Sequence, residues 1–135
     1  MIQGLAATQR EARKRDPLEL AMYPSGKWEG FWFQEQFGKQ SMRAFTLRFE
    51  RGEIAGGGRD VIGPFTFSGA YDLQTGTIAM VKQYVGKHRV AYRGQPDGEG
   101  CIVGTWNIGD NWSGPFLMKP AATESRSDEP IQEMA

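Results

Sequence analysis

The sequence contains a single cysteine and a single histidine, Cys101 and His88, among its 135 residues. One cysteine cannot form an internal disulfide, and this pair cannot supply the ligands of a structural zinc site. No apolar run approaches the roughly 20 residues that a membrane-spanning helix needs. The N-terminus lacks the continuous apolar segment of a secretory signal. These absences favour a cytoplasmic protein that uses no metal or other cofactor.

An excess of charge of either sign is also missing, because 16 basic residues balance 16 acidic ones. Proteins that bind nucleic acids or membrane surfaces usually present a basic face. We therefore expect neither nucleic acid nor a membrane as a partner. The chain does have 18 glycines and 12% aromatic residues, a composition typical of an all-β domain.

Composition divides the chain into three segments. Residues 1–25 have helical character, and Asp16-Pro17 is a suitable start for a short helix because Asp caps helices and Pro fits their first position. Residues 26–119 are strand-like and predict a β-barrel domain. Residues 120–135 are polar, contain two prolines and predict a disordered tail.

Eight strands separated by turn signals are predicted in the middle segment. Short connections such as Arg51-Gly52 and residues 73–76 are typical of hairpin loops. Eight strands with short connections close most economically into an antiparallel up-and-down barrel, because closure removes exposed sheet edges. The predicted strands are Lys27–Gln34, Ser41–Glu50, Glu53–Asp60, Phe65–Asp72, Thr77–Val85, His88–Gln95, Gly100–Ile108 and Trp112–Lys119.

The turn at residues 96–98 sets the register of the sixth and seventh strands. Its Pro-Asp-Gly sequence is typical of a tight turn with Gly in the left-handed conformation. This turn predicts that Gln95 pairs with Glu99, which would place Tyr92 opposite Ile102.

Two other loops decide which residues face the interior. Residues 85–87 and 109–111 must each form a three-residue loop if the apolar residues are to share one inner face. A two-residue turn at Gly86-Lys87 would instead direct Lys82 and Tyr84 to solvent. We expect the three-residue loops.

With that register, inward-facing aromatic and polar residues gather at one end of the barrel. An unpaired buried charge is costly, so Lys82 needs Asp60, water or a ligand. The other end is mostly apolar and closed by Trp28. The polar end predicts a pocket for one small polar or anionic molecule that suits aromatic walls. The candidate ligand-binding residues are Trp32, Gln34, Asp60, Lys82, Tyr84, His88, Trp106 and Trp112.

Other functions remain open. The inward polar residues can form a structural network above a filled barrel, in which case the protein is an interaction or oligomerisation module without a ligand. A third class is a barrel isomerase or cyclase with His88 or Tyr84 as the acid–base group. We expect a binding protein rather than an enzyme.

An apolar patch is predicted on the outside of the barrel, formed by Phe31, Phe33 and Leu117. Such a patch is usually covered. The N-terminal helix could cover it through Leu18, Met22 and Tyr23, or a second subunit could do so in a homodimer.

The residues Gly26-Lys27-Trp28 open the first predicted strand and resemble the Gly-x-Trp start of calycin barrels, the lipocalins and avidins. The resemblance covers residues 26–119 as architecture, while its motif is three residues long. It implies a closed barrel with Trp28 at the bottom and a ligand at the open top. The Thr-Asp-Tyr motif of lipocalins and the biotin-contact pattern of avidins are not found, so biotin binding is not implied.

Overall fold

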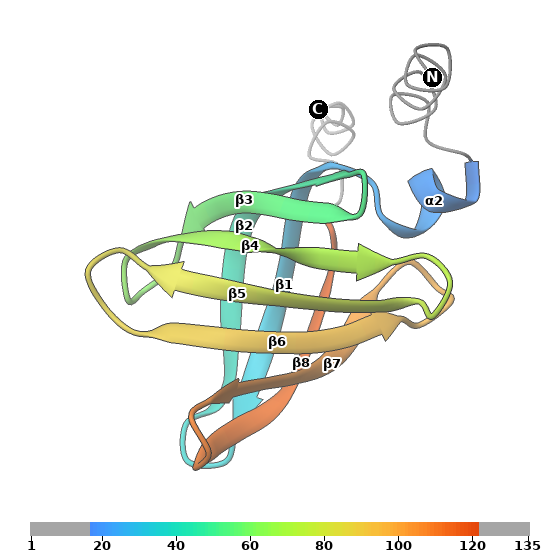
Figure 1. Ribbon diagram of the computed structural model, residues 1–135. Coiled ribbons are helices and arrows are strands. Elements are labelled where there is room, and N and C mark those ends of the chain that lie inside the picture. Colours follow the sequence, from blue (N-terminus) through green and yellow to red (C-terminus); the bar gives the residue numbers. More distant parts are fainter. Residues whose placement is uncertain (1–16, 122–135) are drawn as a thin grey trace, which may run out of the picture.

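The computed structural model describes residues 17–121, which form a closed barrel of eight antiparallel strands (Figure 1). Each strand pairs with the next in the chain, and β1 pairs with β8 to close the sheet. The predicted all-β meander with a short N-terminal helix is confirmed. In chain order, the elements are α2 (Pro17–Met22), β1 (Gly26–Gln34), β2 (Gly38–Glu50), β3 (Glu53–Arg59), β4 (Pro64–Asp72), β5 (Thr77–Tyr84), β6 (Arg89–Pro96), β7 (Ile102–Ile108) and β8 (Trp112–Pro120).

Some expectations concern residues outside this range. The predicted earlier part of the N-terminal segment, including the Asp16 cap, and nearly all of the predicted tail lie outside the described residues. Within residues 17–121, no helix has both the length and the apolar character needed to cross a membrane.

The two ends of the barrel differ in their loops. The β1–β2, β3–β4, β5–β6 and β7–β8 loops surround one end, which we call the mouth. The β2–β3, β4–β5 and β6–β7 loops surround the other, which we call the closed end, and α2 lies beside it (Figure 1). Because alternate residues of a strand face the interior, side chains from all eight strands meet between these ends.

Most hairpin loops follow the local sequence signals. Arg51 and Gly52 have φ of 53° and 79°, as a two-residue loop of mirror-image type requires, and Glu50 pairs with Glu53. At the mouth, the backbone N–H of Tyr84 donates to the His88 carbonyl at 3.1 Å, which leaves residues 85–87 as the loop. The predicted three-residue loop is therefore confirmed there.

The β7–β8 loop is confirmed in the same way, since Ile108 pairs with Trp112 across residues 109–111. Gly109 has φ of 61°, a left-handed conformation that glycine adopts without steric cost. Both three-residue loops thus keep the apolar residues of the flanking strands on one inner face.

The predicted register of β6 and β7 is wrong, because β7 is displaced along β6 from its expected position. Pro96 pairs with Ile102, and Tyr92 lies opposite Trp106 rather than Ile102. The connection is the longer loop of residues 97–101, because the Asp97 carboxylate accepts hydrogen bonds from the backbone N–H groups of Glu99 at 2.7 Å and Cys101 at 3.0 Å. This Asx-type arrangement stabilises the longer loop over a tight turn.

Two predicted strands also end too late or begin too early. Asp60 falls after β3 in a loop, and His88 falls before β6. Asp60 and Gly63 exchange backbone hydrogen bonds at 3.0 and 3.1 Å, which closes a turn before β4. The Gly63-Pro64 pair ends the ladder, because Gly63 has φ of 144° and proline lacks a backbone donor.

The closed end is filled by a residue from outside the barrel strands. Tyr23 follows α2, is fully buried, and contacts the rings of Phe49 and Tyr71 with centroids 5.4 and 4.8 Å away. Trp28 is fully buried beside them and donates its indole N–H to the Pro24 carbonyl at 2.8 Å. The predicted closure by a tryptophan is confirmed, with Tyr23 added to it.

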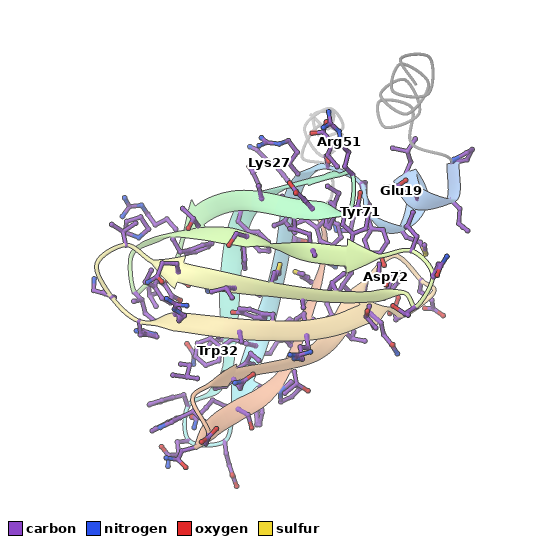
Figure 2. All side chains as sticks on the ribbon, in the orientation of Figure 1. Glu19, Lys27, Trp32, Arg51, Tyr71 and Asp72 are labelled. Atoms are coloured by element: carbon purple, nitrogen blue, oxygen red, sulfur yellow. The ribbon has the colours of Figure 1, made fainter. Side chains whose placement is uncertain are left out.

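The helix α2 does not cover the outer patch, which corrects that expectation. The Tyr71 hydroxyl donates to the Glu19 carboxylate at 2.6 Å and joins α2 to the closed end; Figure 2 shows the two side chains there. Leu18 remains 66% exposed, and Met22 packs partly against the core. The Tyr71–Glu19 hydrogen bond and the fully buried Tyr23 ring hold α2 beside the closed end instead.

Candidate functional site

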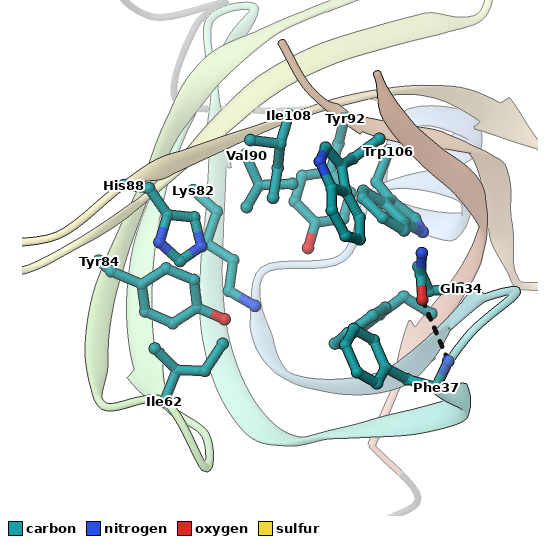
Figure 3. A pocket seen from close by; sticks show the side chains of 12 residues that line it. Gln34, Phe37, Ile62, Lys82, Tyr84, His88, Val90, Tyr92, Trp106 and Ile108 are labelled. Carbon is teal, nitrogen blue, oxygen red and sulfur yellow. Dashed lines mark hydrogen bonds between the residues drawn. The ribbon is translucent and has the colours of Figure 1, made fainter. Parts of the chain in front are cut away.

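A cavity of about 380 Å³ opens at the mouth of the barrel (Figure 3). Seven of the eight sequence-predicted site residues line it, and Asp60 is the one that does not. Aromatic and aliphatic side chains make up most of the lining, and its polar groups belong to Gln34, Lys82, His88 and the hydroxyls of Tyr84 and Tyr92. The residues that line the cavity are Trp32, Gln34, Phe37, Ile62, Lys82, Tyr84, His88, Val90, Tyr92, Trp106, Ile108 and Trp112.

Asp60 lies outside the cavity lining and binds three residues that belong to it, Ile62, Lys82 and Tyr84. Its Oδ2 accepts hydrogen bonds from Lys82 Nζ at 2.9 Å and from the Tyr84 hydroxyl at 2.5 Å. Its Oδ1 accepts the backbone N–H of Ile62 at 2.9 Å, which fixes the β3–β4 loop. One carboxylate thus holds together β5 and the loop that carries Ile62 into the cavity lining.

Burial and pairing act in opposite directions on the ionisation of this group. Burial alone would raise the pKa of Asp60, but the hydrogen bonds from Tyr84 and Lys82 and the Lys82 charge lower it below its usual value. Burial lowers the pKa of Lys82, and Asp60 offsets part of that effect. An ion pair with both charges present is therefore the state that the geometry favours near neutral pH.

The tyrosine hydroxyls at the site stay protonated. The pKa of Tyr84 is raised far above its usual value by burial, by its hydrogen bond to Asp60 and by the Asp60 charge. The pKa of Tyr92 is raised mainly by burial. Because the Tyr84 hydroxyl keeps its proton and donates it in a hydrogen bond to Asp60, Tyr84 is poorly suited to act as a general base, which counts against it in the isomerase or cyclase alternative.

Gln34 ends β1 and shapes the β1–β2 loop. Its side-chain oxygen Oε1 accepts the backbone N–H groups of Gln36 at 3.0 Å and Phe37 at 3.1 Å. The side chain is 7% exposed, although amides prefer the surface. This local cap directs Phe37 over the cavity, where it is 61% exposed at the rim.

Tryptophans form much of the opposite wall. Trp106 donates its indole N–H to the Phe33 carbonyl at 3.0 Å, and the Trp32 ring meets it edge-on with centroids 5.4 Å apart. These contacts fix the orientation of both rings. Trp112 lies at the rim and is 43% exposed. The cavity is therefore preformed on this side.

His88 lies at the rim rather than deep in the barrel. It is exposed, and its ring centroid lies 5.0 Å from that of Tyr84. Among residues 17–121, no group of three His, Cys, Asp or Glu side chains is placed to hold a metal ion.

Sequence reasoning missed several lining residues, of which Tyr92 matters most. The alternation placed Tyr92 on the inner face, but the wrong β6–β7 register put it opposite Ile102 and away from the mouth. The second glycine after Asp97, Gly100, was the sequence signal for the longer loop, because glycine favours turns. In the structure, Gly100 has φ of 95°. Phe37 and Ile62 lie in loops, where strand alternation makes no prediction.

Comparison with known proteins gave no significant match, whether to a family model, to a curated protein or to a solved structure.

Proposed function

We propose that this barrel binds one small organic molecule at its mouth, where the resemblance to calycin barrels implies a ligand. The mostly aromatic and aliphatic lining favours a largely apolar molecule over the polar or anionic one expected from the sequence. The observation that carries the proposal is the cavity of about 380 Å³, bounded by ordered aromatic rings. Protein interiors are close-packed, with few voids larger than a water molecule. The size falls within the range of roughly 300–1,000 Å³ typical of small-molecule sites.

The asymmetry between the two ends supports the same proposal. At the closed end, Trp28 and Tyr23 are fully buried in the interior. At the mouth, the rings of Trp32 and Trp106 instead pack edge-on against each other and line the cavity. Flat aromatic or conjugated ligands suit such a site, because they stack against indole rings and gain from burial of apolar surface.

The proposal is tested by ligand-induced changes in stability and in tryptophan fluorescence. Three of the four tryptophans line the cavity, so a bound aromatic compound is expected to change their emission. Binding also raises the free energy of unfolding, by about 2.7 kcal/mol at a ligand concentration of 100 times Kd. A panel of one-ring to three-ring aromatic compounds covers the size of the cavity.

A matched variant fills the cavity and leaves both charges of the ion pair in place, although Val90 pairs with Lys82 across β5 and β6. Val90 lies on β6 in the lining and is 6% exposed, so Val90→Phe extends a ring into the open space. We expect this variant to fold and to lose both responses. If no compound of the panel changes the emission or the melting temperature of the wild type, the barrel does not bind such molecules and the proposal is wrong.

A homodimer through the outer patch is the second candidate function. Phe31 is partly buried, with Lys39 Nζ 4.2 Å above its ring, and it pairs across the sheet with Leu117, also partly buried. Phe33 is 42% exposed and favours this candidate. Sedimentation of the wild type and Phe33→Glu tests it: we expect a dimer that the variant dissociates, and a monomer in both cases would refute it.

A further inference from the structure

The hydroxyl of Tyr92 is a buried donor that has no good acceptor. Tyr92 is 2% exposed, and its hydroxyl has one partner within the described part of the chain, the Met42 sulfur at 4.0 Å. A thioether sulfur is a weak acceptor, and this distance is long. Figure 3 shows the hydroxyl directed into the cavity. A buried hydroxyl left in this state costs free energy unless a ligand or water accepts its hydrogen bond.

Gln34 supplies a second donor at the same cavity. Its oxygen is already used by the β1–β2 loop, and in Figure 3 that oxygen faces Phe37 while the amide nitrogen is turned the other way. No acceptor among residues 17–121 takes a hydrogen bond from this Nε2 group. Gln34 is 7% exposed and lines the cavity, where a ligand or water can accept the hydrogen bonds of its amide.

Lys82 is the remaining cation of the inner cavity, and its charge is already balanced. Its Nζ lies 2.9 Å from Asp60 Oδ2, and the two side chains are 1% and 4% exposed. The same nitrogen lies 4.4 Å from the ring centroid of Phe65 and 4.8 Å from that of Tyr84. A ligand carboxylate would therefore add an unbalanced charge to an apolar space, which is costly. This balance argues against the anionic ligand that the sequence suggested.

We propose that the ligand of this cavity is a flat apolar molecule that carries a neutral hydrogen-bond acceptor, such as a ketone or amide carbonyl. The acceptor oxygen receives hydrogen bonds from Tyr92 and Gln34, and the apolar body lies against Trp32 and Trp106. The inference rests on the proposed function, because it names the ligand class of the same site. A site built around such donors rejects an analogue that lacks the acceptor.

Three naphthalene derivatives of similar shape test the acceptor: methyl naphthyl ketone, its isopropenyl analogue and naphthoate. Dissociation constants come from tryptophan fluorescence or from calorimetry. We expect the ketone to bind about tenfold more tightly than the isopropenyl compound, which has the same shape without the oxygen. We also expect naphthoate to bind more weakly than the ketone.

Two variants test the donors. Tyr92→Phe removes the hydroxyl, and Gln34→Glu removes the N–H groups while it keeps the oxygen that caps residues 36 and 37. Each is expected to reduce the preference for the ketone severalfold. Tyr71→Phe removes a hydroxyl at the closed end and is the matched control, for which the preference should not change. Because the readout is a ratio of two affinities within one variant, altered stability does not imitate the effect.

The outcomes separate this inference from the proposed function. If wild type binds the isopropenyl compound as tightly as the ketone, the acceptor is not recognised and the inference is wrong, while the binding function stands. Tighter binding of naphthoate than of the ketone overturns the neutral character of the ligand. An unchanged preference in both Tyr92→Phe and Gln34→Glu overturns the assignment of the donors. Binding of none of the compounds overturns the inference together with the proposed function.

Discussion

Lys82 and Asp60 form an ion pair inside the barrel, with Nζ 2.9 Å from Oδ2 and side chains that are 1% and 4% exposed. The pair joins strand β5 to the loop that follows β3, and the Tyr84 hydroxyl donates to the same carboxylate oxygen. Two buried charges lose their hydration, and each then depends on the other. Because of this dependence, we expect the stability of the mouth to be sensitive to substitution of either residue.

Removal of one partner of the ion pair should destabilise the barrel strongly, whereas removal of both partners should cost less than the sum of the two single losses. Lys82→Met or Asp60→Asn leaves the other group without its counter-charge, and we expect each to lower the free energy of unfolding by about 3 kcal/mol. The double variant should lose much less than the sum. Urea unfolding measures all three, and the exposed Lys87→Met should stay within about 0.5 kcal/mol of wild type. Additive losses would contradict a direct coupling.

Acid should destabilise the protein partly through Asp60. Because the folded pKa of Asp60 is lowered, the unfolded chain binds its proton at higher pH than the folded chain does. The contribution is therefore complete above the ordinary value of about 3.9 and is lost as pH falls through the folded pKa. Unfolding free energies from pH 6 to pH 2 should fall less steeply in Asp60→Asn than in wild type. Asp97, whose pKa is lowered by backbone hydrogen bonds from Glu99 and Cys101, supplies a remaining slope. An identical slope in the two proteins would argue against this origin.

Lys82 should also make stability rise with pH, but in the alkaline range. Its folded pKa is lowered, so the buried ammonium opposes folding below that pKa. Stability should therefore rise as pH increases from the folded pKa toward the ordinary value of about 10.4. Thermal unfolding of Asp60→Asn, in which Lys82 lacks its counter-charge, should show a larger rise than wild type. A rise that is equal in Lys82→Met would assign the effect to other groups.

Tyr23 should contribute strongly to stability although it lies outside the strands. It is fully buried between Phe49 and Tyr71, so Tyr23→Ala leaves a hole in the closed end. We expect a loss of about 3–5 kcal/mol, as for other buried aromatic residues. Leu18→Ala on the preceding helix α2 is the control, because Leu18 is 66% exposed and should change stability little. A small loss for Tyr23→Ala would mean that the Tyr23 ring does not close the barrel.

Gly104 should tolerate no side chain, because β6 and β7 approach closely there. A Cβ atom at this position would lie 1.9 Å from the Arg93 carbonyl oxygen, so the strands would have to separate. We expect Gly104→Ala to cost on the order of 3 kcal/mol. Gly98→Ala meets open space and strains only its φ of 84°, which should cost about 1–2 kcal/mol. Equal losses in urea unfolding would indicate that close strand approach is not what requires Gly104.

Local sequence was sufficient for the number and order of the strands and for their inner faces, although not for every strand end. Strand alternation has a period of two, so a correct loop such as Arg51-Gly52 assigns Phe49 and Ile54 to the same face without knowledge of the rest of the chain. The same logic directed Lys82 and Tyr84 inward once residues 85–87 were taken as the loop. Even the wrong register of β6 preserved the inner face, because it was displaced by an even number of residues.

Only the tertiary structure decided which inward residues meet. Tyr92 became a cavity residue because the Asp97 carboxylate stabilises a longer loop and brings Tyr92 opposite Trp106. Tyr23 became part of the core because barrel closure creates an open end that a ring from outside the strands can fill. Local periodicity contains no information about which residue Tyr92 lies opposite, or about the packing of Tyr23 into the end of the barrel. The sequence by itself determined an all-β meander and its inner face, whereas long-range packing decided the composition of the cavity and the closure of the other end.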